Sequence, residues 1–342
     1  MDIKEIRSLA KDRMKGVCNL CSECNGIYCS GQVPGMGGTG SGRAMKRSYE
    51  KISQVKLNLK TIHEAKKPET NIMIFNQNLS LPLISAPVTG SEINMGGYLS
   101  EADYCKAVVS GSKMAGTFAM IGDSGNPQFY IDGLNAITEE NGCGIAIIKP
   151  RENNKIIENI KKAEIADALA VGVDIDGAGL VTMALLGQPV GPKSKAELKE
   201  IISSTNLPVI LKGIMTVEEA LLAVEIGAKA IVVSNHGGRI LDDTLAPIEV
   251  LPEIAKAVKG KITIMADGSV RSGRDIFKYI AAGADVVLCA RPIIWGAIGG
   301  GSEGVASYIN HLKNELIQAM ILTGANNIAE INSDMISYNF DI

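Results

Sequence analysis

The chain has 342 residues, of which 46% are hydrophobic, and its 34 Lys and Arg against 37 Asp and Glu give a net charge of −3. This composition suits a large α/β core, and the absence of a block of like charge excludes a nucleic-acid footprint. No apolar run approaches the roughly 18 residues of a membrane span, and the charged, amphipathic N-terminus does not resemble a secretory signal. We therefore expect a cytoplasmic protein with no nucleic-acid or membrane partner.

Residues 1–80 precede the regular pattern of the chain and are expected to form a Cys-rich N-terminal extension. A helix is predicted at Ile3–Met14, followed by four cysteines and a glycine-rich run, Gly35–Gly42, which we interpret as a flexible connector. Val55–Leu59 and Ile72–Phe75 are predicted to pair as a hairpin. That hairpin would plug the N-terminal end of the domain that follows.

Residues 81–342 alternate short apolar runs with amphipathic segments. Helical patterns such as Thr216–Ile226 and Ser272–Ala282 carry an N-cap residue at the start and a glycine just after the end. Eight strands, each followed by a helix, predict an α/β fold of the (β/α)8 TIM-barrel type. The candidate strands are Leu81–Ala86, Ala115–Ile121, Gly144–Ile148, Ala168–Asp174, Pro208–Lys212, Ala230–Ser234, Ile262–Ala266 and Val286–Cys289.

Charged and small residues follow the later strands, where a barrel places its ligand-facing groups. Lys212 ends an apolar strand, and His236 precedes two glycines that let the backbone approach a ligand. Arg239, three residues further on, offers a forked cation for a carboxylate. Arg271 and Arg291 follow the seventh and eighth strands, where barrels commonly bind a phosphate.

Taken together, these segments resemble the FMN-dependent 2-hydroxy-acid oxidases and dehydrogenases, such as glycolate oxidase and lactate oxidase. The resemblance extends from about Leu81 to Thr323 and is densest in the second half. It implies a barrel that binds FMN, a small-molecule substrate and a homo-oligomer, a tetramer in many such proteins. The residues that carry it are Ile210–Ile214, Ser234–Arg239, Leu241-Asp242, Leu251–Ile254, Ala266–Gly268, Arg271–Gly273 and Arg291-Pro292.

The resemblance also implies a role for individual residues. His236 corresponds to the base that takes the hydroxyl proton while hydride passes from C2 to flavin N5, and Asp174 to the aspartate that pairs with it. Lys212 corresponds to the lysine at the N1/O2 side of the flavin, and Arg239 to the arginine that clamps the substrate carboxylate. The implied cofactor contacts are Pro87, Val88, Thr89, Gly122, Lys212, Ser234, His236, Gly237, Asp267, Gly268, Ser269, Arg271, Ala290 and Arg291.

This chain departs from the family pattern on the substrate side. Gly122 stands where the family has Ser or Thr, and Ile147–Pro150 replaces a Gln-x-Tyr whose tyrosine binds substrate. A second substrate arginine has no counterpart before Arg239, so Lys149 is our candidate for the missing positive charge, and Tyr28 for the N-terminal substrate tyrosine. The substrate is expected to be lactate-like or larger, and its identity stays open.

Cys18, Cys21, Cys24 and Cys29 fall within twelve residues, with the spacing Cys-x2-Cys-x2-Cys-x4-Cys. That spacing is close to the bacterial ferredoxin pattern, although Ser30 stands where a proline usually follows the last cysteine. An iron–sulfur cluster or zinc, redox-active thiols, and simple packing all remain open for these cysteines. An iron–sulfur cluster beside FMN could accept electrons one at a time from the reduced flavin. The final electron acceptor is not predicted by the sequence.

Two other functional readings compete with a hydroxy-acid oxidoreductase. One is a non-redox FMN barrel of the type 2 isopentenyl diphosphate isomerase kind, because Ser85–Gly90 is loosely similar to the first loop of those enzymes. The other is a flavin or iron–sulfur electron-transfer or sensor protein, suggested by the altered substrate side and the cysteines. Turnover in a substrate screen separates the oxidoreductase from the sensor protein, and catalysis that leaves the net oxidation state of the flavin unchanged distinguishes the isomerase.

Overall fold

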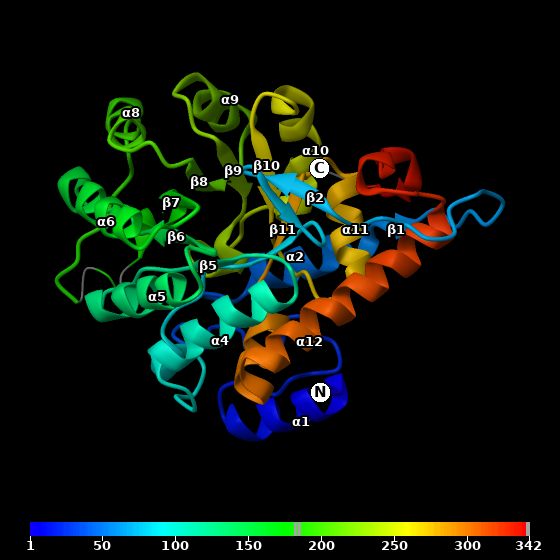
Figure 1. Ribbon diagram of the computed structural model, residues 1–342, viewed down its shortest axis with the longest axis horizontal. Helices are drawn as coiled ribbons and strands as arrows, with labels where there is room; N and C mark the ends of the chain where they lie inside the picture. The colour runs from blue at the N-terminus through cyan, green and yellow to red at the C-terminus, as the bar shows by residue number, and fades with distance from the viewer. Residues whose placement is uncertain (181–182, 184–185, 340–342) are drawn as a thin grey trace.

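A computed structural model describes residues 1–180, 183 and 186–339 of the chain. Its eight parallel strands close into a barrel in the order β10-β11-β4-β5-β6-β7-β8-β9 (Figure 1). This arrangement confirms the predicted (β/α)8 fold. The barrel strands are β4 (Leu83–Ser85), β5 (Ala119–Ile121), β6 (Gly144–Ile148), β7 (Ala170–Asp174), β8 (Val209–Ile214), β9 (Ala230–Val233), β10 (Thr263–Ala266) and β11 (Val286–Cys289).

Helices surround the barrel, and several begin at the residues that the sequence indicates. The Thr216 side chain accepts the backbone N–H of Glu219 at the start of α9, and Ser272 forms a capping box with Asp275 at the start of α11. The surrounding helices are α4 (Glu101–Met114), α5 (Pro127–Glu139), α6 (Asn153–Ile165), α8 (Lys195–Ser203), α9 (Val217–Glu225), α10 (Pro247–Val258), α11 (Gly273–Ala281) and α12 (Arg291–Thr323).

One cluster of apolar side chains fills the barrel interior, and a hairpin closes its N-terminal end. The hairpin consists of β2 (Ile72–Ile74) and β3 (Gln77–Leu79), and its Ile74 and Leu79 pack with inward-facing side chains such as Met120. The predicted plug is therefore present. Its predicted partner strand was wrong, because β1 (Lys56–Leu57) pairs with β12 (Ile336–Ser337) near the C-terminus.

The physical reason for the different pairing is a tight turn. Phe75 and Asn76 both have positive φ angles, 48° and 60°, and they join β2 directly to β3. Two central residues of this conformation match the right-handed twist of a two-residue hairpin. Strand β2 therefore forms its backbone hydrogen bonds with β3, which follows it directly, and β1 pairs with β12 near the other end of the sequence.

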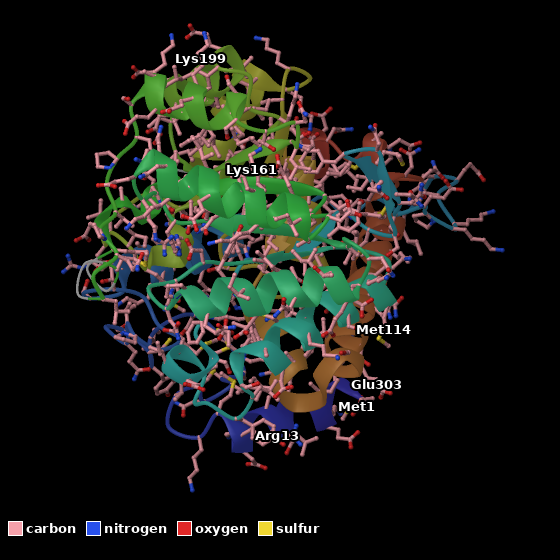
Figure 2. The ribbon with its side chains drawn as sticks, turned by 60° about the vertical axis from the view of Figure 1, so that its left-hand side comes forward. Met1, Arg13, Met114, Lys161, Lys199 and Glu303 are labelled. Carbon is pink, nitrogen blue, oxygen red and sulfur yellow. The ribbon has the colours of Figure 1, made fainter. Side chains whose placement is uncertain are left out.

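The N-terminal helix α1 (Ile3–Arg13) packs along the first part of α12. Figure 2 shows Met1, Arg13 and Glu303 at the same end of the molecule. The Arg13 guanidinium donates to the carbonyls of Ile298 (2.8 Å) and Gly299 (3.0 Å), near a break in α12 at Gly300 and Gly301. None of the described helices is both long and apolar enough to cross a membrane.

The remaining elements are short or lie over the C-terminal end of the barrel. Helix α2 contacts the turn η2, and α3 follows the loop after β4. These elements are α2 (Arg43–Gln54), α3 (Ser91–Asn94) and the 3-10 turns η1 (Ile175–Gly179), η2 (His236–Gly238), η3 (Ile328–Glu330) and η4 (Ser333–Met335).

Candidate active site

A cavity opens at the C-terminal ends of the barrel strands, where the sequence predicts the chemistry. Segments from the N-terminal extension, Val33–Met36, form part of its wall. Apolar side chains such as Phe129 and Ile147 line it beside the charged groups. The predicted site residues that line the cavity are Pro87, Val88, Thr89, Gly122, Lys149, Asp174, Lys212, His236, Gly237, Arg239, Asp267, Gly268, Ser269, Arg271, Ala290 and Arg291.

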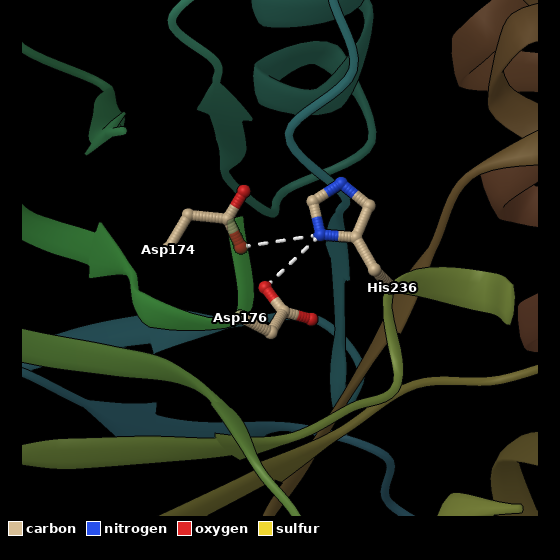
Figure 3. Close-up of side chains that lie close together, drawn as sticks. All are labelled: Asp174, Asp176 and His236. Carbon is tan, nitrogen blue, oxygen red and sulfur yellow. Dashed lines mark hydrogen bonds and ion pairs between the residues drawn. The ribbon is translucent and has the colours of Figure 1, made fainter. Parts of the chain in front are cut away.

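His236 lies between two carboxylates (Figure 3). Its Nδ1 is 3.1 Å from Asp176 Oδ1 and 3.4 Å from Asp174 Oδ1. A carboxylate only accepts hydrogen bonds, so this arrangement places the ring proton on Nδ1. The other ring nitrogen, Nε2, lies on the side of the ring away from both aspartates and keeps a lone pair for a reacting group.

The backbone around His236 explains why glycines follow it. His236, Gly237 and Gly238 have φ angles of 57°, 65° and 72°, a conformation that residues with a Cβ adopt rarely. A Cβ on Gly238 would lie 2.5 Å from the backbone nitrogen of Met45, so only glycine lets α2 approach this turn. The turn η2 is therefore held in a strained conformation against the N-terminal extension.

Asp176 was not among the predicted site residues, although it lies only two positions after Asp174. Gly213, in β8, makes room for it, because a Cβ there would lie 2.6 Å from the Asp176 side chain. The Oδ2 atom of Asp176 is buried and has no hydrogen-bond partner among the described residues. The Asp-x-Asp spacing after a buried strand was the sequence signal that could have identified it.

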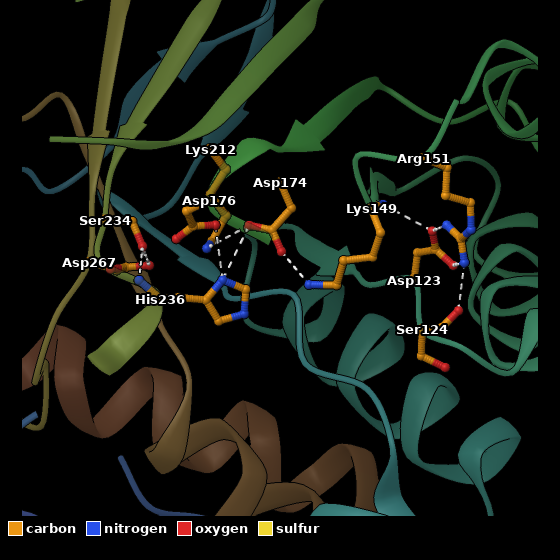
Figure 4. A network of polar contacts seen from close by, with 10 residues as sticks. All are labelled: Asp123, Ser124, Lys149, Arg151, Asp174, Asp176, Lys212, Ser234, His236 and Asp267. Carbon is orange, nitrogen blue, oxygen red and sulfur yellow. Dashed lines mark hydrogen bonds and ion pairs between the residues drawn. The ribbon is translucent and has the colours of Figure 1, made fainter. Parts of the chain in front are cut away.

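Asp174 joins three positively charged or protonatable groups (Figure 4). Its carboxylate is 3.1 Å from Lys212 Nζ and 2.5 Å from Lys149 Nζ, in addition to His236. Burial by itself raises the pKa of Asp174, but the charges of His236, Lys149 and Lys212 outweigh it and hold the pKa well below its usual value. The aspartate therefore stays ionised throughout the physiological range.

Lys212 is buried at the mouth of β8 and remains charged. Burial lowers its pKa, but the carboxylates of Asp174, Asp176 and Asp267 outweigh this effect and raise the pKa above its usual value. The side chains of Asp174, Asp176 and His236 come close enough to suggest a metal site. Two ammonium groups on Asp174 disfavour a divalent cation there, so we interpret the group as an acid–base centre.

Ser234 supports the site without lining the cavity, contrary to its prediction as a cofactor contact. Its hydroxyl donates to Asp267 Oδ2 (2.9 Å) and accepts the backbone N–H of His236 (3.0 Å). The Ser234 hydroxyl thus holds Asp267 and the backbone of His236 in place. The other oxygen of Asp267, Oδ1, is buried with no partner among the described residues, which leaves an acceptor for a hydroxyl group of a bound ligand.

Two arginines converge at the end of the cavity near β10 and β11. Arg271 Nε and Nη2 are buried and have no hydrogen-bond partner in the part of the chain that the structure describes. Burial lowers the pKa of Arg291, and the neighbouring charge of Arg271 lowers it further. Unpartnered guanidinium N–H groups and two cations in mutual repulsion fit a bound phosphate, with Asp267 Oδ1 left for a polyhydroxylated chain. The residues present therefore fit FMN.

Arg239 reaches from η2 to the glycine-rich segment. Its Nη1 donates to the carbonyls of Gly35 (2.6 Å) and Gly37 (2.8 Å), and its Nη2 to Asn94 Oδ1 (3.2 Å). Burial, and then the charge of Arg291, lowers the pKa of Arg239 to about 10. The guanidinium thus lines the cavity as a cation held by neutral oxygens, which suits the binding of a carboxylate ligand.

The Gly35–Gly42 segment is fixed by contacts with the barrel, and Gly35 and Met36 line the cavity, so our interpretation of it as a flexible connector was wrong. Besides its bonds to Arg239, it donates the Thr39 N–H to the Gly238 carbonyl (2.8 Å). Asp242 accepts both the N–H and the hydroxyl of Ser41, at 2.8 and 2.7 Å. These contacts could not be predicted from the sequence, because their partners lie some 200 residues away.

Tyr28 does not reach the cavity, so its assignment as a substrate residue was wrong. Its side chain is 74% exposed on the loop between Cys24 and Cys29. The structure instead places a buried ion pair beside Lys149. Arg151 binds Asp123 through both guanidinium nitrogens, and Asp123 Oδ2 accepts the Lys149 N–H at 2.9 Å. This pair fixes the backbone that carries Lys149.

The four clustered cysteines lie behind the arginine end of the cavity. Cys18, Cys21, Cys24 and Cys29 are half-buried free thiols. Burial raises the pKa of the Cys24 thiol, but the charges of Arg271 and Arg291 outweigh it and the pKa falls below its usual value. No three of these sulfur atoms approach one another within 4.8 Å in the described structure, so a preformed zinc site is not present.

The loop after β4 is fixed by a buried glutamate whose charge depends on pH. Glu101 Oε2 accepts the N–H groups of Gly90 (2.9 Å) and Ser91 (2.7 Å), directly after Thr89. Burial raises the pKa of Glu101 from 4.5 to about 7, although these two hydrogen bonds act in the opposite direction. The fold therefore favours the protonated form of this side chain.

Glu101→Gln is expected to remove part of the pH dependence of stability. Because the pKa of Glu101 is raised in the folded state, its contribution to stability is complete below pH 4.5 and is lost as the pH rises to about 7. The unfolding midpoint of the native chain relative to the variant should fall by several degrees between pH 5 and pH 8 in thermal denaturation. Glu303→Gln, at an exposed glutamate on α12, is the control. A constant difference between native chain and Glu101→Gln contradicts the raised pKa.

The chain is similar in sequence to a known protein family and to several of its members. Residues 182–338 match the family model described as FMN-dependent dehydrogenase. The chain is 31% identical over 312 residues to a 2-hydroxyacid oxidase of Dictyostelium discoideum, covering 83% of this chain and 80% of that protein. It is 42% identical over 172 residues to an L-lactate oxidase of Lactobacillus jensenii, covering 50% of this chain and 41% of that protein.

A solved structure of mandelate oxidase with benzoyl-formic acid superposes on the chain with a TM-score of 0.80. The superposition covers 99% of this chain and 98% of that one, at 25% sequence identity. The similarity thus extends over the whole barrel and the N-terminal extension.

Proposed function

Because the chain belongs to the family of FMN-dependent 2-hydroxyacid oxidases, we propose that His236 and Arg239 are the groups with which it oxidises its 2-hydroxy acid. The observation that carries this proposal is the placement of His236, with Nδ1 held between Asp174 and Asp176 and the opposite nitrogen free at the cavity. A histidine held in this way is oriented as a general base.

His236 Nε2 accepts the proton of the substrate hydroxyl in this proposal. The imidazolium that forms lies against two carboxylates, which stabilise its charge. Lys149 and Lys212 keep Asp174 ionised, so the carboxylate is charged before the proton arrives. The side chains therefore hold an acceptor for one proton at a fixed position.

Arg239 is proposed to bind the substrate carboxylate. Its guanidinium lines the cavity together with His236, and its backbone-carbonyl partners hold it in place. A carboxylate on Arg239 would fix the acid with its hydroxyl toward His236, which reduces the orientational cost of the reaction. The apolar lining, including Phe129 and Ile147, would receive the side chain of the acid.

The cofactor is proposed to lie between these groups and the two phosphate-binding arginines. Arg271 and Arg291 would hold its phosphate, Asp267 its hydroxylated chain, and Lys212 with the Pro87–Thr89 loop its ring. When bound, FMN supplies the hydride acceptor for C2 of the acid. The positive charge of Lys212 beside the ring would stabilise negative charge there.

A substrate panel tests the proposed function. FMN-loaded protein is incubated with 2-hydroxy acids of increasing side-chain length and a dye acceptor, and the 2-oxo acid product is measured. At least one acid is expected to yield product, and its carboxamide is expected to yield far less because Arg239 needs a carboxylate. Equal turnover of acid and amide would contradict the role of Arg239.

Lys149→Met tests whether Lys149 replaces the missing substrate-binding charge. If its ammonium group contacts the substrate carboxylate, the variant should raise KM about tenfold while kcat changes little. Steady-state kinetics with the best acid of the panel measure both constants, and Lys155→Met, an exposed lysine on α6, serves as the control. A loss confined to kcat would mean that Lys149 acts only through Asp174.

The comparisons favour oxidation of a 2-hydroxy acid over the isomerase and sensor readings. The electron acceptor, the homo-oligomeric state, a tetramer by resemblance, and the cytoplasmic location stay predictions. Size-exclusion chromatography with light scattering measures the oligomeric state directly.

A further inference from the structure

The four-cysteine loop, residues 18–29, is a cluster of thiols that the proposed function does not use. Its members, Cys18, Cys21, Cys24 and Cys29, are four half-buried free thiols carried by one stretch of twelve residues. Cys18 and Cys24 also pack against the core, so the group faces inward and is not a set of surface thiols.

The spacing of the sulfur atoms distinguishes between two kinds of metal centre. Tetrahedral zinc with Zn–S bonds of about 2.3 Å requires sulfur atoms roughly 3.8 Å apart. No three of the thiols lie within 4.8 Å of one another in the described structure. An iron–sulfur cluster separates its cysteine ligands by iron and sulfide atoms, so it accommodates thiols that are grouped but further apart.

The charges around the thiols fit an anionic cluster. Arg7 donates to two carbonyls of the cysteine loop, so its guanidinium lies against it, and Arg271 and Arg291 line the neighbouring end of the cavity. A cluster held by four thiolates carries net negative charge, and cations with hydrogen-bond donors near its sulfur atoms stabilise it. Arg271 and Arg291 would then stand between the cluster and the phosphate of the cofactor.

Trp295 supplies a separate observation. Its side chain is 2% exposed, and its indole nitrogen has no hydrogen-bond partner of normal geometry among the described residues. The neighbour with which this N–H interacts is Cys18. The indole N–H is therefore a buried donor beside the cysteine loop with no partner of normal geometry among the described residues, and because an unsatisfied N–H is costly, an anionic group bound there would stabilise it.

The backbone of the loop is held in place from both sides. Arg7 donates to the carbonyls of Leu20 (2.9 Å) and Cys21 (3.0 Å) and stacks on the Trp295 ring at 4.8 Å. At the other end, a Cβ on Gly37 would lie 1.7 Å from the Cys29 carbonyl oxygen, so only glycine allows this contact. The backbone that carries the four cysteines is therefore held by contacts at both ends of the loop.

We propose that Cys18, Cys21, Cys24 and Cys29 bind a four-iron, four-sulfide cluster at the phosphate end of the cofactor site. The first three cysteines keep the Cys-x2-Cys-x2-Cys spacing that binds such clusters in bacterial ferredoxins. The cluster would give the chain a group that changes oxidation state by one electron. This proposal does not depend on the identity of the substrate.

The test measures iron directly, not activity. The full chain is purified without oxygen, reconstituted with ferrous iron and sulfide, and analysed for iron, acid-labile sulfide and zinc. About four iron and four sulfide per chain are expected, with a paramagnetic signal after reduction by dithionite. Cys24→Ser should lower bound iron at least fivefold, and Cys143→Ser, a free cysteine outside the loop, should leave it unchanged.

Two results would overturn the proposal. One is a reconstituted native chain with no iron, or with stoichiometric zinc and no sulfide. The other is four freely titrating loop thiols in that chain under the same conditions. Bound FMN, released and measured by absorbance, reports whether Cys24→Ser is folded. If that variant does not fold, the iron and sulfide content of the native chain alone decides the proposal.

Discussion

Replacing His236 with asparagine is expected to slow the anaerobic bleaching of the bound flavin by a 2-hydroxy acid about a thousandfold. Asparagine can replace the donor to Asp174 and Asp176, but it cannot accept the proton of the substrate hydroxyl. It also tolerates the positive φ of 57° at this position better than other residues, so the turn η2 should be preserved. Stopped-flow absorbance measures the rate.

The FMN content of His236→Asn should equal that of the native chain, which separates lost chemistry from lost cofactor. His311→Asn, at a histidine on α12 that does not line the cavity, provides a control and should reduce at the native rate. Bleaching by His236→Asn at the native rate would show that another group is the base.

Asp174→Asn is expected to destabilise the chain by about 3–5 kcal/mol, because it leaves two lysines with a weakened partner in a buried site. Lys212 is 4% exposed, and its ammonium group lies 3.1 Å from Asp174 Oδ1. The unfolding midpoint should fall by roughly 5 °C in calorimetry. Flavin reduction should slow as well, because one of the two carboxylates that orient His236 loses its charge.

Asp176→Asn distinguishes the two carboxylates. Asp176 is the nearer to His236 Nδ1, at 3.1 Å, but forms no ion pair with a lysine among the described residues. Its substitution should slow flavin reduction while the unfolding midpoint stays within about 2 °C of the native value. Equal destabilisation by both substitutions would mean that the lysines do not depend on Asp174.

The barrel could be predicted because each of its strands is buried on both faces and is therefore a nearly continuous apolar run. Helix starts could also be predicted, because the cap residues Thr216 and Ser272 each bond to a backbone N–H only three residues later. These are local signals. The positions of Lys212, His236 and Arg271 at the cavity followed from the barrel rule that ligand-facing groups end the strands.

The parts that sequence could not predict depend on distant partners. Lys56 lies opposite Ser337 in a strand pair, and the Gly35 carbonyl accepts a hydrogen bond from Arg239. No local sequence pattern predicts either partner. Tyr28 was misplaced because a correspondence in sequence position does not reveal which way the loop turns its side chain. Asp176 was missed for a different reason: the family resemblance identifies only Asp174, although Asp176, two residues later, makes the shorter contact with His236.

The measurement that tests the central claim most directly is an anaerobic titration of the FMN-loaded chain with 2-hydroxy acids, followed by flavin absorbance and 2-oxo acid analysis. The account predicts that at least one acid bleaches the flavin completely and yields one equivalent of 2-oxo acid per flavin. A flavin that dithionite bleaches but no 2-hydroxy acid does would contradict it.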